Sequence, residues 1–395
     1  MTADQYIDNS GTRIRAALLS LAFVAAMWLP LLKQTLDGAA ETASPAEAVT
    51  DSIPAVNWSR ASIRAFPRAF DDYYGSHFGF RNTLIRGYGA VMLFGLGVSP
   101  SDRVVVGKNG WYFYSGRVLR NENPIADFTR ETPLNDSQLK QWCEILRRRH
   151  DWLNARGVRY IVMLVPNKAE IYPEYVPESV RQGDAQSTVE QFAGYVRANT
   201  DIRVLDLTRP LLDAKPWVRL YHQTDTHWND CGGFVGYGEL VASLHPWFPS
   251  MKAAPVEAFE VRQVPSTEGE LIRFMNLEGV VEAEHVFSLH PLRPGRAAFS
   301  LVEEPEWRYT GDTGDVDLPR AVIYGDSFLG PLAPRLSEHF ERSVYCFSYS
   351  RFPIEVIEAE HPDVVVEEIL QRFLRDDVVN PPDVAAFRNQ DEPKL

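Results

Sequence analysis

Cysteine is scarce in this chain, and the few that occur lie far apart. The 395 residues contain Cys143, Cys231 and Cys346, whose spacing matches no metal-binding or redox motif. An odd number of cysteines cannot form a closed set of disulfides. We therefore expect all three to be small buried hydrophobic residues, the first two in helices and the third in a strand, and we infer no compartment from them.

Basic residues are also few. The sequence has no long run of lysine and arginine, and its formal net charge is −13 at pH 7, which argues against a nucleic-acid surface. The short cluster Arg147–Arg149 is predicted to be a solvated helix face. With 45% hydrophobic and 12% aromatic residues, the chain can fill a large core, so it is not a disordered protein.

Long apolar runs are confined to the N-terminal region. The segment from Ala16 to Leu32 has no charge, with Arg13 and Arg15 before it and Lys33 after it. It is just long enough to span a membrane, and the charges favour a cytoplasmic N-terminus with the rest of the chain outside. We predict a signal anchor; the alternative is a cleaved signal peptide, although the apolar run is longer than most of these contain.

Composition divides the chain into four parts. Residues 1–36 are predicted to be a cytoplasmic tail and signal anchor. Residues 37–57 are rich in Ala, Glu, Thr, Ser and Pro and lack aromatic residues up to Trp58, which is typical of a flexible tether. A folded domain is expected over residues 58–380, followed by a C-terminal tail over residues 381–395.

Helix and strand patterns alternate through the folded domain. Two packing helices are expected over residues 64–74 and 81–95, and Lys108-Asn-Gly110 predicts the turn of a β-hairpin over residues 104–114. Further strands are predicted at residues 158–165, 202–207, 321–324, 344–348 and 364–367, and helices at 137–156, 189–199, 231–244 and 329–340. This order predicts an α/β fold with a doubly wound, mostly parallel sheet.

Two short motifs carry the candidate chemistry. In Thr224-Asp-Thr-His-Trp-Asn229, Asp225 and His227 are two residues apart, and in an extended segment such side chains project to the same side. A carboxylate that accepts the Nδ1 proton leaves Nε2 free to act as a base. A metal site or a hydrogen-bonded core histidine are the alternatives.

The second motif is Gly325-Asp-Ser-Phe328, which follows the apolar run Arg320–Tyr324. Gly325 permits a sharp turn at the carboxyl end of this predicted strand. Ser327 would then lie near a helix N-terminus, where backbone N–H groups can stabilise an oxyanion. Together the motifs predict a catalytic triad of Asp225, His227 and Ser327. Tyr324, directly before the turn, is expected in the core.

With these motifs the chain resembles the SGNH hydrolase-like acetyltransferases of the alginate O-acetyltransferase (AlgJ/AlgX) type. Four further regions resemble recurrent blocks of that family: Asp71–Arg81, Val106–Phe113, Val165–Pro173 and His361–Val365. The order Asp, His, Ser also resembles this type, whereas ordinary SGNH esterases have the serine first. The region from Trp247 to Arg320 matches the family pattern least, so it does not indicate the substrate.

The resemblance implies further site residues. SGNH enzymes supplement the serine N–H with an asparagine, and Asn167 follows the predicted strand that ends at Val165, so it is the candidate oxyanion donor. Lys168 would contact substrate or water. Arg351, in another loop at the same sheet edge, would position an acyl group or sugar. His77 and Arg81 are expected to form a structural corner.

We therefore expect an O-acetyltransferase that uses a Ser327-linked acetyl-enzyme and needs no cofactor or metal. The resemblance implies a polysaccharide acceptor, and a multi-pass membrane acyltransferase as the acetyl donor. The predicted location is the bacterial inner membrane, with a single-pass anchor and the catalytic domain in the periplasm. The alternatives are an SGNH carbohydrate acetylesterase and a non-catalytic polysaccharide-binding assembly factor.

Overall fold

A computed structural model describes residues 3–37, 54–55, 58–116, 123–266, 269–302, 308–348 and 351–375. The predicted C-terminal tail and almost all of the predicted tether lie outside these ranges. The chain divides into two compact units, Met1–Leu96 and Gly97–Leu395, and each is considered separately. The predicted division into four parts stays a prediction.

The first unit is helical. It contains α1 (Ala3–Asp37), α2 (Arg60–His77), α3 (Arg81–Ala90) and the π-helical turn η2 (Val91–Gly95). Within α1, the stretch Gly11–Pro30 is long and apolar enough to cross a membrane. The side chain of Ser59 caps α2 by accepting from Ser62 N at 3.2 Å, as serine does at helix N-termini. The two helices predicted here are confirmed.

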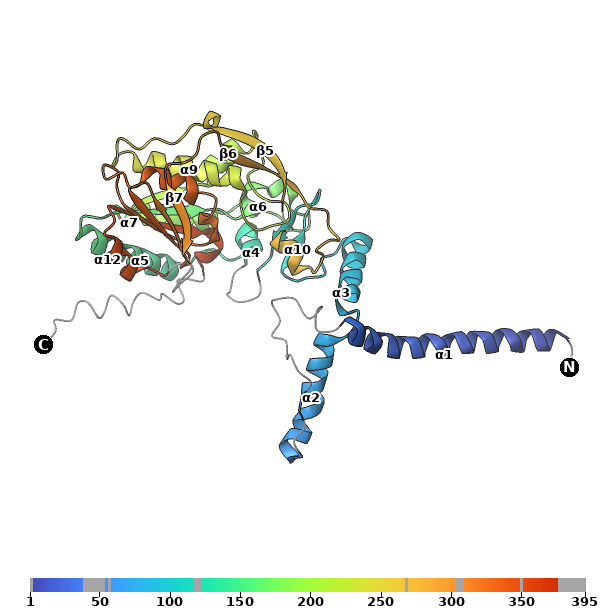
Figure 1. The fold of residues 1–395 in the computed structure, drawn as a ribbon. Helices are drawn as coiled ribbons and strands as arrows, with labels where there is room; N and C mark the ends of the chain where they lie inside the picture. Colours follow the sequence, from blue (N-terminus) through green and yellow to red (C-terminus); the bar gives the residue numbers. More distant parts are fainter. Residues whose placement is uncertain are drawn as a thin grey trace. The chain divides into compact units, whose positions relative to one another are not determined.

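The second unit is built around a sheet flanked by helices (Figure 1). This sheet has seven strands in the order β4-β3-β11-β9-β10-β8-β7. The first five of these strands run parallel, whereas β8 and β7 are antiparallel. The predicted mostly parallel sheet is therefore confirmed, with an antiparallel edge that the sequence did not indicate. The strands are β3 (Arg159–Val165), β4 (Arg203–Asp206), β7 (Ala298–Val302), β8 (Arg308–Asp312), β9 (Ala321–Tyr324), β10 (Arg342–Cys346) and β11 (Val364–Leu370).

Helices cover both faces of this sheet. Alternate residues of β3 point to opposite faces, so Ile161 and Met163 join one hydrophobic cluster and Val162 and Leu164 join the other. The second cluster includes residues of α5 (Asp136–Asn154), α7 (Thr188–Asn199) and α12 (Ile354–Glu360). The first includes residues of α6 (Lys168–Ile171), α8 (Thr208–Ala214), α9 (Asp230–Leu244) and α11 (Ala333–Leu336).

Smaller elements surround the sheet. The predicted hairpin is confirmed as β1 (Val104–Val106) and β2 (Tyr112–Tyr114), with Asn109 and Gly110 at φ values of 54° and 77° in its turn. A second two-stranded ribbon, β5 (Phe259–Pro265) with β6 (His285–Pro291), was not predicted. The remaining elements are α4 (Pro124–Thr129), η3 (Pro173–Tyr175), η4 (Val256–Ala258), α10 (Glu270–Phe274) and η7 (Gln371–Phe373).

Two local predictions were wrong. The helix expected over residues 329–340 is broken into η5 (Ser327–Leu329), α11 and η6 (Ser337–His339), because Pro331 and Pro334 have no N–H and restrict the residue before them. Arg149 is not solvated: it is buried against Glu367, and Tyr160 and Tyr324 also donate to that carboxylate. The three cysteines are buried and free, as expected.

Candidate active site

The predicted site residues gather at the carboxyl edge of the parallel strands. Asn167 follows β3 and Ser327 follows β9, and β11 lies between these strands in the sheet. Arg372 follows β11 in the short helix η7. Loops at this edge of an open α/β sheet commonly form ligand sites.

Asp225, His227 and Ser327 form a continuous chain of hydrogen bonds. His227 Nδ1 lies 2.6 Å from Asp225 Oδ1, and His227 Nε2 lies 2.6 Å from Ser327 Oγ. The segment is not extended as predicted but bent into a loop, closed by a bridge between Tyr221 and Trp228. In this bend Asp225 Oδ1 also accepts from His227 N at 3.0 Å, so one oxygen holds both the backbone and the ring.

Phe328 joins the two halves of the site. Its ring centroid is 4.8 Å from that of His227, and its carbonyl oxygen accepts from Trp228 Nε1 at 3.0 Å. Phe328 is buried, whereas the neighbouring Ser327 is exposed. The packing therefore fixes the turn on one side and presents the serine hydroxyl to solvent on the other.

The Asp225 carboxylate is stabilised in its charged form. Burial alone would raise its pKa, but hydrogen bonds from the ring and backbone of His227 and from Glu270 N hold the pKa of Asp225 well below its usual range. The bond from Glu270 N to Asp225 Oδ2 is 2.8 Å long. A carboxylate that stays ionised can keep the Nδ1 proton of His227 in place.

Glu284 supports the same loop from the region that the sequence left unassigned. Its carboxylate accepts from Gln223 N at 2.9 Å, from Thr224 N at 3.1 Å and from Thr224 Oγ1 at 2.9 Å, and it pairs with Arg219 at 2.9 Å. Burial would raise the pKa of Glu284, yet the neighbouring His222 and the hydrogen bonds from these backbone groups lower it to about 2. The loop is therefore braced by a buried carboxylate.

Lys168 braces this loop from the other side. Its Nζ donates to the carbonyl oxygens of His222, Gln223 and Asp225 at 3.0, 3.2 and 2.7 Å. Nζ also lies 5.6 and 5.2 Å from the ring centroids of Trp111 and Phe113 in the β-hairpin. The expected contact of Lys168 with substrate or water is thus replaced by contacts with backbone carbonyls.

Two buried carboxyl groups lie behind the serine. Asp326 N donates to Glu368 Oε2 at 2.9 Å, and Asp326 Oδ1 accepts from Phe328 N at 2.8 Å. Burial and the nearby Asp326 raise the pKa of Glu368 well above its usual range. Because Phe328 N is already engaged, it does not serve as an oxyanion donor.

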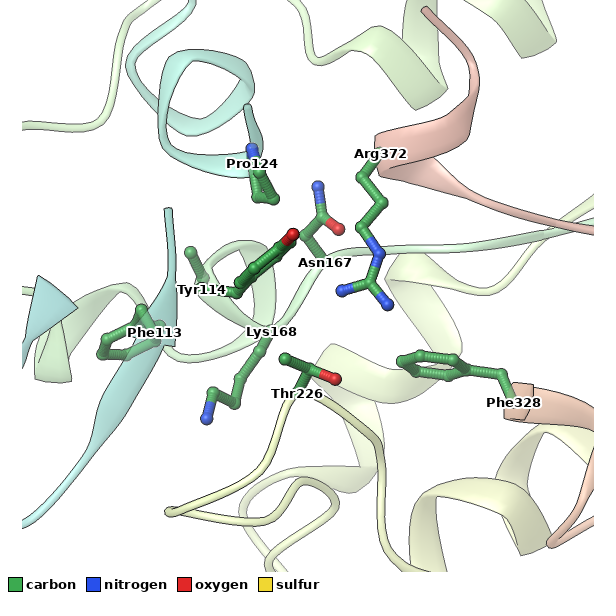
Figure 2. A pocket seen from close by; sticks show the side chains of 9 residues that line it. Phe113, Tyr114, Pro124, Asn167, Lys168, Thr226, Phe328 and Arg372 are labelled. Carbon is green, nitrogen blue, oxygen red and sulfur yellow. The ribbon is translucent and has the colours of Figure 1, made fainter. Parts of the chain in front are cut away.

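A small pocket opens beside the loop that carries Asp225 and His227. It is lined by Phe113, Tyr114, Pro124, Asn167, Lys168, Ala169, Thr226, Phe328 and Arg372. Figure 2 shows the guanidinium of Arg372 directed into the space between Asn167, Thr226 and Phe328, with Lys168 Nζ pointing away. In the described part of the chain, the buried Asn167 Nδ2 donates to no acceptor, so it is available to a ligand.

Arg351 is not among the residues that line this pocket. It lies exposed in the loop after β10, where its carbonyl oxygen accepts from Ser348 Oγ at 2.8 Å. The arginine that reaches the pocket is Arg372, which the sequence did not single out. Both arginines follow parallel strands, so strand order alone does not distinguish them.

Three residues of the site could also hold a cation. Potential ligand atoms of Asp225, His227 and Glu270 lie within 4.8 Å of one another. However, the Nδ1 atom of His227 already lies 2.6 Å from Asp225, and Glu270 Oε2 accepts from Thr226 Oγ1 at 3.0 Å. The arrangement thus fits a proton held between Asp225 and His227.

Comparison with known proteins gives a family match over most of the second unit. Residues 104–350 match the family described as "SGNH hydrolase-like domain, acetyltransferase AlgX". The chain is 26% identical over 322 residues to a probable alginate O-acetylase AlgJ of Azotobacter vinelandii, covering 74% of this chain and 78% of that protein. A Pseudomonas aeruginosa protein of the same description is 27% identical over 177 residues, covering 44% and 41%.

Solved structures show a similar fold. Bacillus cereus PatB1, determined with a sulfonyl adduct, has a TM-score of 0.50 at 12% identity, covering 70% of this chain and 96% of that one. The O-acetyltransferase domain of Pseudomonas putida AlgJ has a TM-score of 0.49 at 20% identity, covering 73% and 99%. The PatB1 match shows a fold shared with that protein over 70% of this chain.

Proposed function

Because this chain belongs to the AlgX family of SGNH hydrolase-like acetyltransferases, we propose that it is an O-acetyltransferase that acts through a Ser327-linked acetyl-enzyme. The observation that supports this most directly is the hydrogen-bonded series Asp225, His227 and Ser327, with the serine exposed at the sheet edge. This arrangement has the parts that acyl transfer requires, namely a nucleophile, a base and a group that orients the base.

In the first step, Ser327 Oγ attacks the carbonyl carbon of a donor acetyl ester. His227 Nε2, 2.6 Å away, accepts the hydroxyl proton and then passes it to the departing alcohol of the donor. One ester bond forms on the serine as the donor ester bond breaks. Asp225 stabilises the transient imidazolium without itself becoming protonated.

In the second step, an acceptor hydroxyl attacks the acetyl-enzyme. His227 accepts the proton of that hydroxyl and returns it to Ser327 Oγ as the ester bond to the enzyme breaks. Attack by a sugar hydroxyl gives an acetylated glycan, whereas attack by water gives acetate. Transfer therefore requires an acceptor that excludes water from the intermediate.

The small pocket would receive the acetyl carbonyl region. Asn167 Nδ2 is buried without an acceptor in the described residues and lines this pocket, so it is the proposed oxyanion donor. Arg372 would add positive charge beside the developing oxyanion. Arg351, in its exposed loop, remains a candidate only for contact with a longer acceptor.

The proposed acceptor and location are supported by the family and by the apolar N-terminal stretch. Relatives described as alginate O-acetylases support an alginate-like extracytoplasmic polysaccharide as the acceptor. The apolar stretch Gly11–Pro30 would anchor the chain in the bacterial inner membrane, with the catalytic unit in the periplasm. A multi-pass membrane acyltransferase would supply the acetyl group, and the anchor would keep Ser327 near that partner.

A test uses the purified protein, a small acetyl ester and polysaccharide acceptors, with and without EDTA. We expect mass spectrometry to find acetyl on Ser327 and on the glycan, and Ser327→Ala to lose both, while Ser300→Ala, an exposed serine on β7, keeps them. Hydrolysis without transfer would favour the esterase alternative, and no turnover a non-catalytic glycan-binding role. Loss of activity with EDTA would point to a metal at Asp225, His227 and Glu270.

A further inference from the structure

Helix α2 has two chemically different faces. At about 100° per residue, Ile63, Phe66, Phe70, Tyr73 and Tyr74 fall on one side of Arg60–His77. The opposite side carries Arg64, Arg68, Asp71 and Asp72. We call the first set the aromatic face of α2. A helix with such faces is stable only if something covers its apolar side.

The rings of the aromatic face pack mainly along their own helix. Ring centroids are 5.7 Å apart for Phe66 and Phe70, 6.1 Å for Phe70 and Tyr74, and 5.7 Å for Tyr74 and Phe78. Even so, Ile63 is 49% and Phe70 42% exposed. We expected this helix to pack against a core, but part of its aromatic face is exposed. This exposed apolar surface is available to another partner.

The corner after α2 indicates where this face lies. Gly79 approaches α1 so closely that a Cβ there would lie 2.2 Å from the carbonyl oxygen of Pro30, and Lys33 Nζ is 5.4 Å from the ring centroid of Phe80. Pro30 is the last residue of the apolar stretch that can cross a membrane. The corner between α2 and α3 therefore packs at the level where the membrane-spanning stretch ends.

From this position we propose that α2 lies in the lipid–water interface, with its aromatic face in contact with lipid. Tyrosine rings are enriched at this depth because they are apolar with a polar tip, and the arginines of the opposite, polar face can pair with lipid phosphate groups. Leu84 and Tyr88 of α3, which are 59% and 60% exposed, extend the apolar surface beyond the corner. The function of this surface is to hold α2 and α3 at the membrane.

The proposal depends on the proposed anchor but not on acetyl transfer, so it is tested by lipid contact. The full chain, with Phe70→Cys labelled by an environment-sensitive fluorophore, is reconstituted in vesicles of phosphatidylglycerol and phosphatidylcholine. Ala61→Cys, on the opposite face of α2, is the matched control. The native cysteines are buried, and the unsubstituted chain measures their background labelling.

We expect spin-labelled lipid to quench the label at position 70 several-fold more strongly than the label at position 61, with iodide showing the reverse order. Equal iodide access at both positions without lipid quenching would overturn the proposal. Protection from iodide without lipid quenching would overturn it in favour of a protein partner or a second copy. Ser327→Ala should leave the lipid result unchanged, so failure of the proposed chemistry is recognised separately.

Discussion

Asp225 accepts three hydrogen bonds, two from His227 and one from Glu270 N. These bonds favour the tautomer of His227 that carries its proton on Nδ1. Nε2, which lies next to Ser327 Oγ, is then free to accept a proton. Because these bonds set the protonation of the His227 ring, a change at Asp225 should affect the chemistry directly.

Asp225→Asn should lower the rate of acetyl transfer about 10³- to 10⁴-fold, because an amide can donate to Nδ1 and favour the wrong tautomer. Steady-state assays with a soluble acetyl ester measure this. Asp213→Asn, in an exposed ion pair with Arg209, is the matched control and should keep the normal rate. A rate within tenfold of the wild type for Asp225→Asn would contradict the role given to this carboxylate.

Lys168 should make stability depend on pH. Burial lowers its pKa from 10.5 to about 7, so between these values the unfolded chain binds one more proton than the folded chain, and the free energy of unfolding rises with pH. Below about pH 7 Lys168 is protonated in both the folded and the unfolded chain, so its contribution to the free energy of unfolding does not change with pH.

The comparison is with Lys168→Met, which cannot titrate. We expect the difference in melting temperature between the wild type and this variant to be level below about pH 7 and to shift in favour of the wild type as the pH increases toward 10.5. Differential scanning fluorimetry at several pH values measures the difference. A constant difference across this range would show that Lys168 keeps its ordinary pKa.

At the scale of elements, the turn after β9 depends on close packing with β11. A Cβ at Gly325 would lie 2.3 Å from Glu368 Oε2 and 2.9 Å from the Glu368 carbonyl oxygen. Gly325 is not among the glycines with positive φ. The glycine is therefore needed for the approach of β11, and not for an unusual backbone conformation as the sequence suggested.

Gly325→Ala should destabilise the second unit by about 1–3 kcal/mol through overpacking and lower the rate, because Ser327 follows two residues later. Chemical unfolding and ester turnover measure the two effects. Gly194→Ala in α7, where a Cβ would meet nothing within 4 Å, is the control and should be neutral or stabilising. Equal behaviour of the two variants would contradict this packing argument.

At the scale of the whole molecule, the proposed active site and the proposed membrane anchor lie in different units. All the proposed site residues lie in Gly97–Leu395, whereas the apolar stretch of α1 lies in Met1–Leu96. A chain that begins at Gly97 should therefore keep turnover of a soluble acetyl ester while losing acetylation of polysaccharide in cells. Ester hydrolysis measures the retained turnover, and the acetyl content of the glycan measures the lost acetylation. Ser327→Ala in the same short chain gives the background of both measurements. Full glycan acetylation by the short chain would contradict a role for the anchor.

The sequence by itself determined the alternation of strands and helices, since hydrophobic periodicity and turn residues are local properties. It also indicated Asp225, His227 and Ser327, because the motifs and the parallel strand order bring them to one sheet edge. The antiparallel strands β7 and β8 and the ribbon of β5 and β6 were missed, and β5 and β7 are largely exposed, so burial gives them no continuous apolar run.

Only the tertiary structure decided which residues surround Asp225, His227 and Ser327. Glu284 and Lys168 reach the loop of Asp225 from distant parts of the chain, and Arg372 lines the pocket while Arg351 remains in an exposed loop. Such contacts depend on how loops pack against one another, which no local pattern records. The physical reason is that burial, and with it the pKa of Lys168 and of Glu284, exists only once the chain is folded.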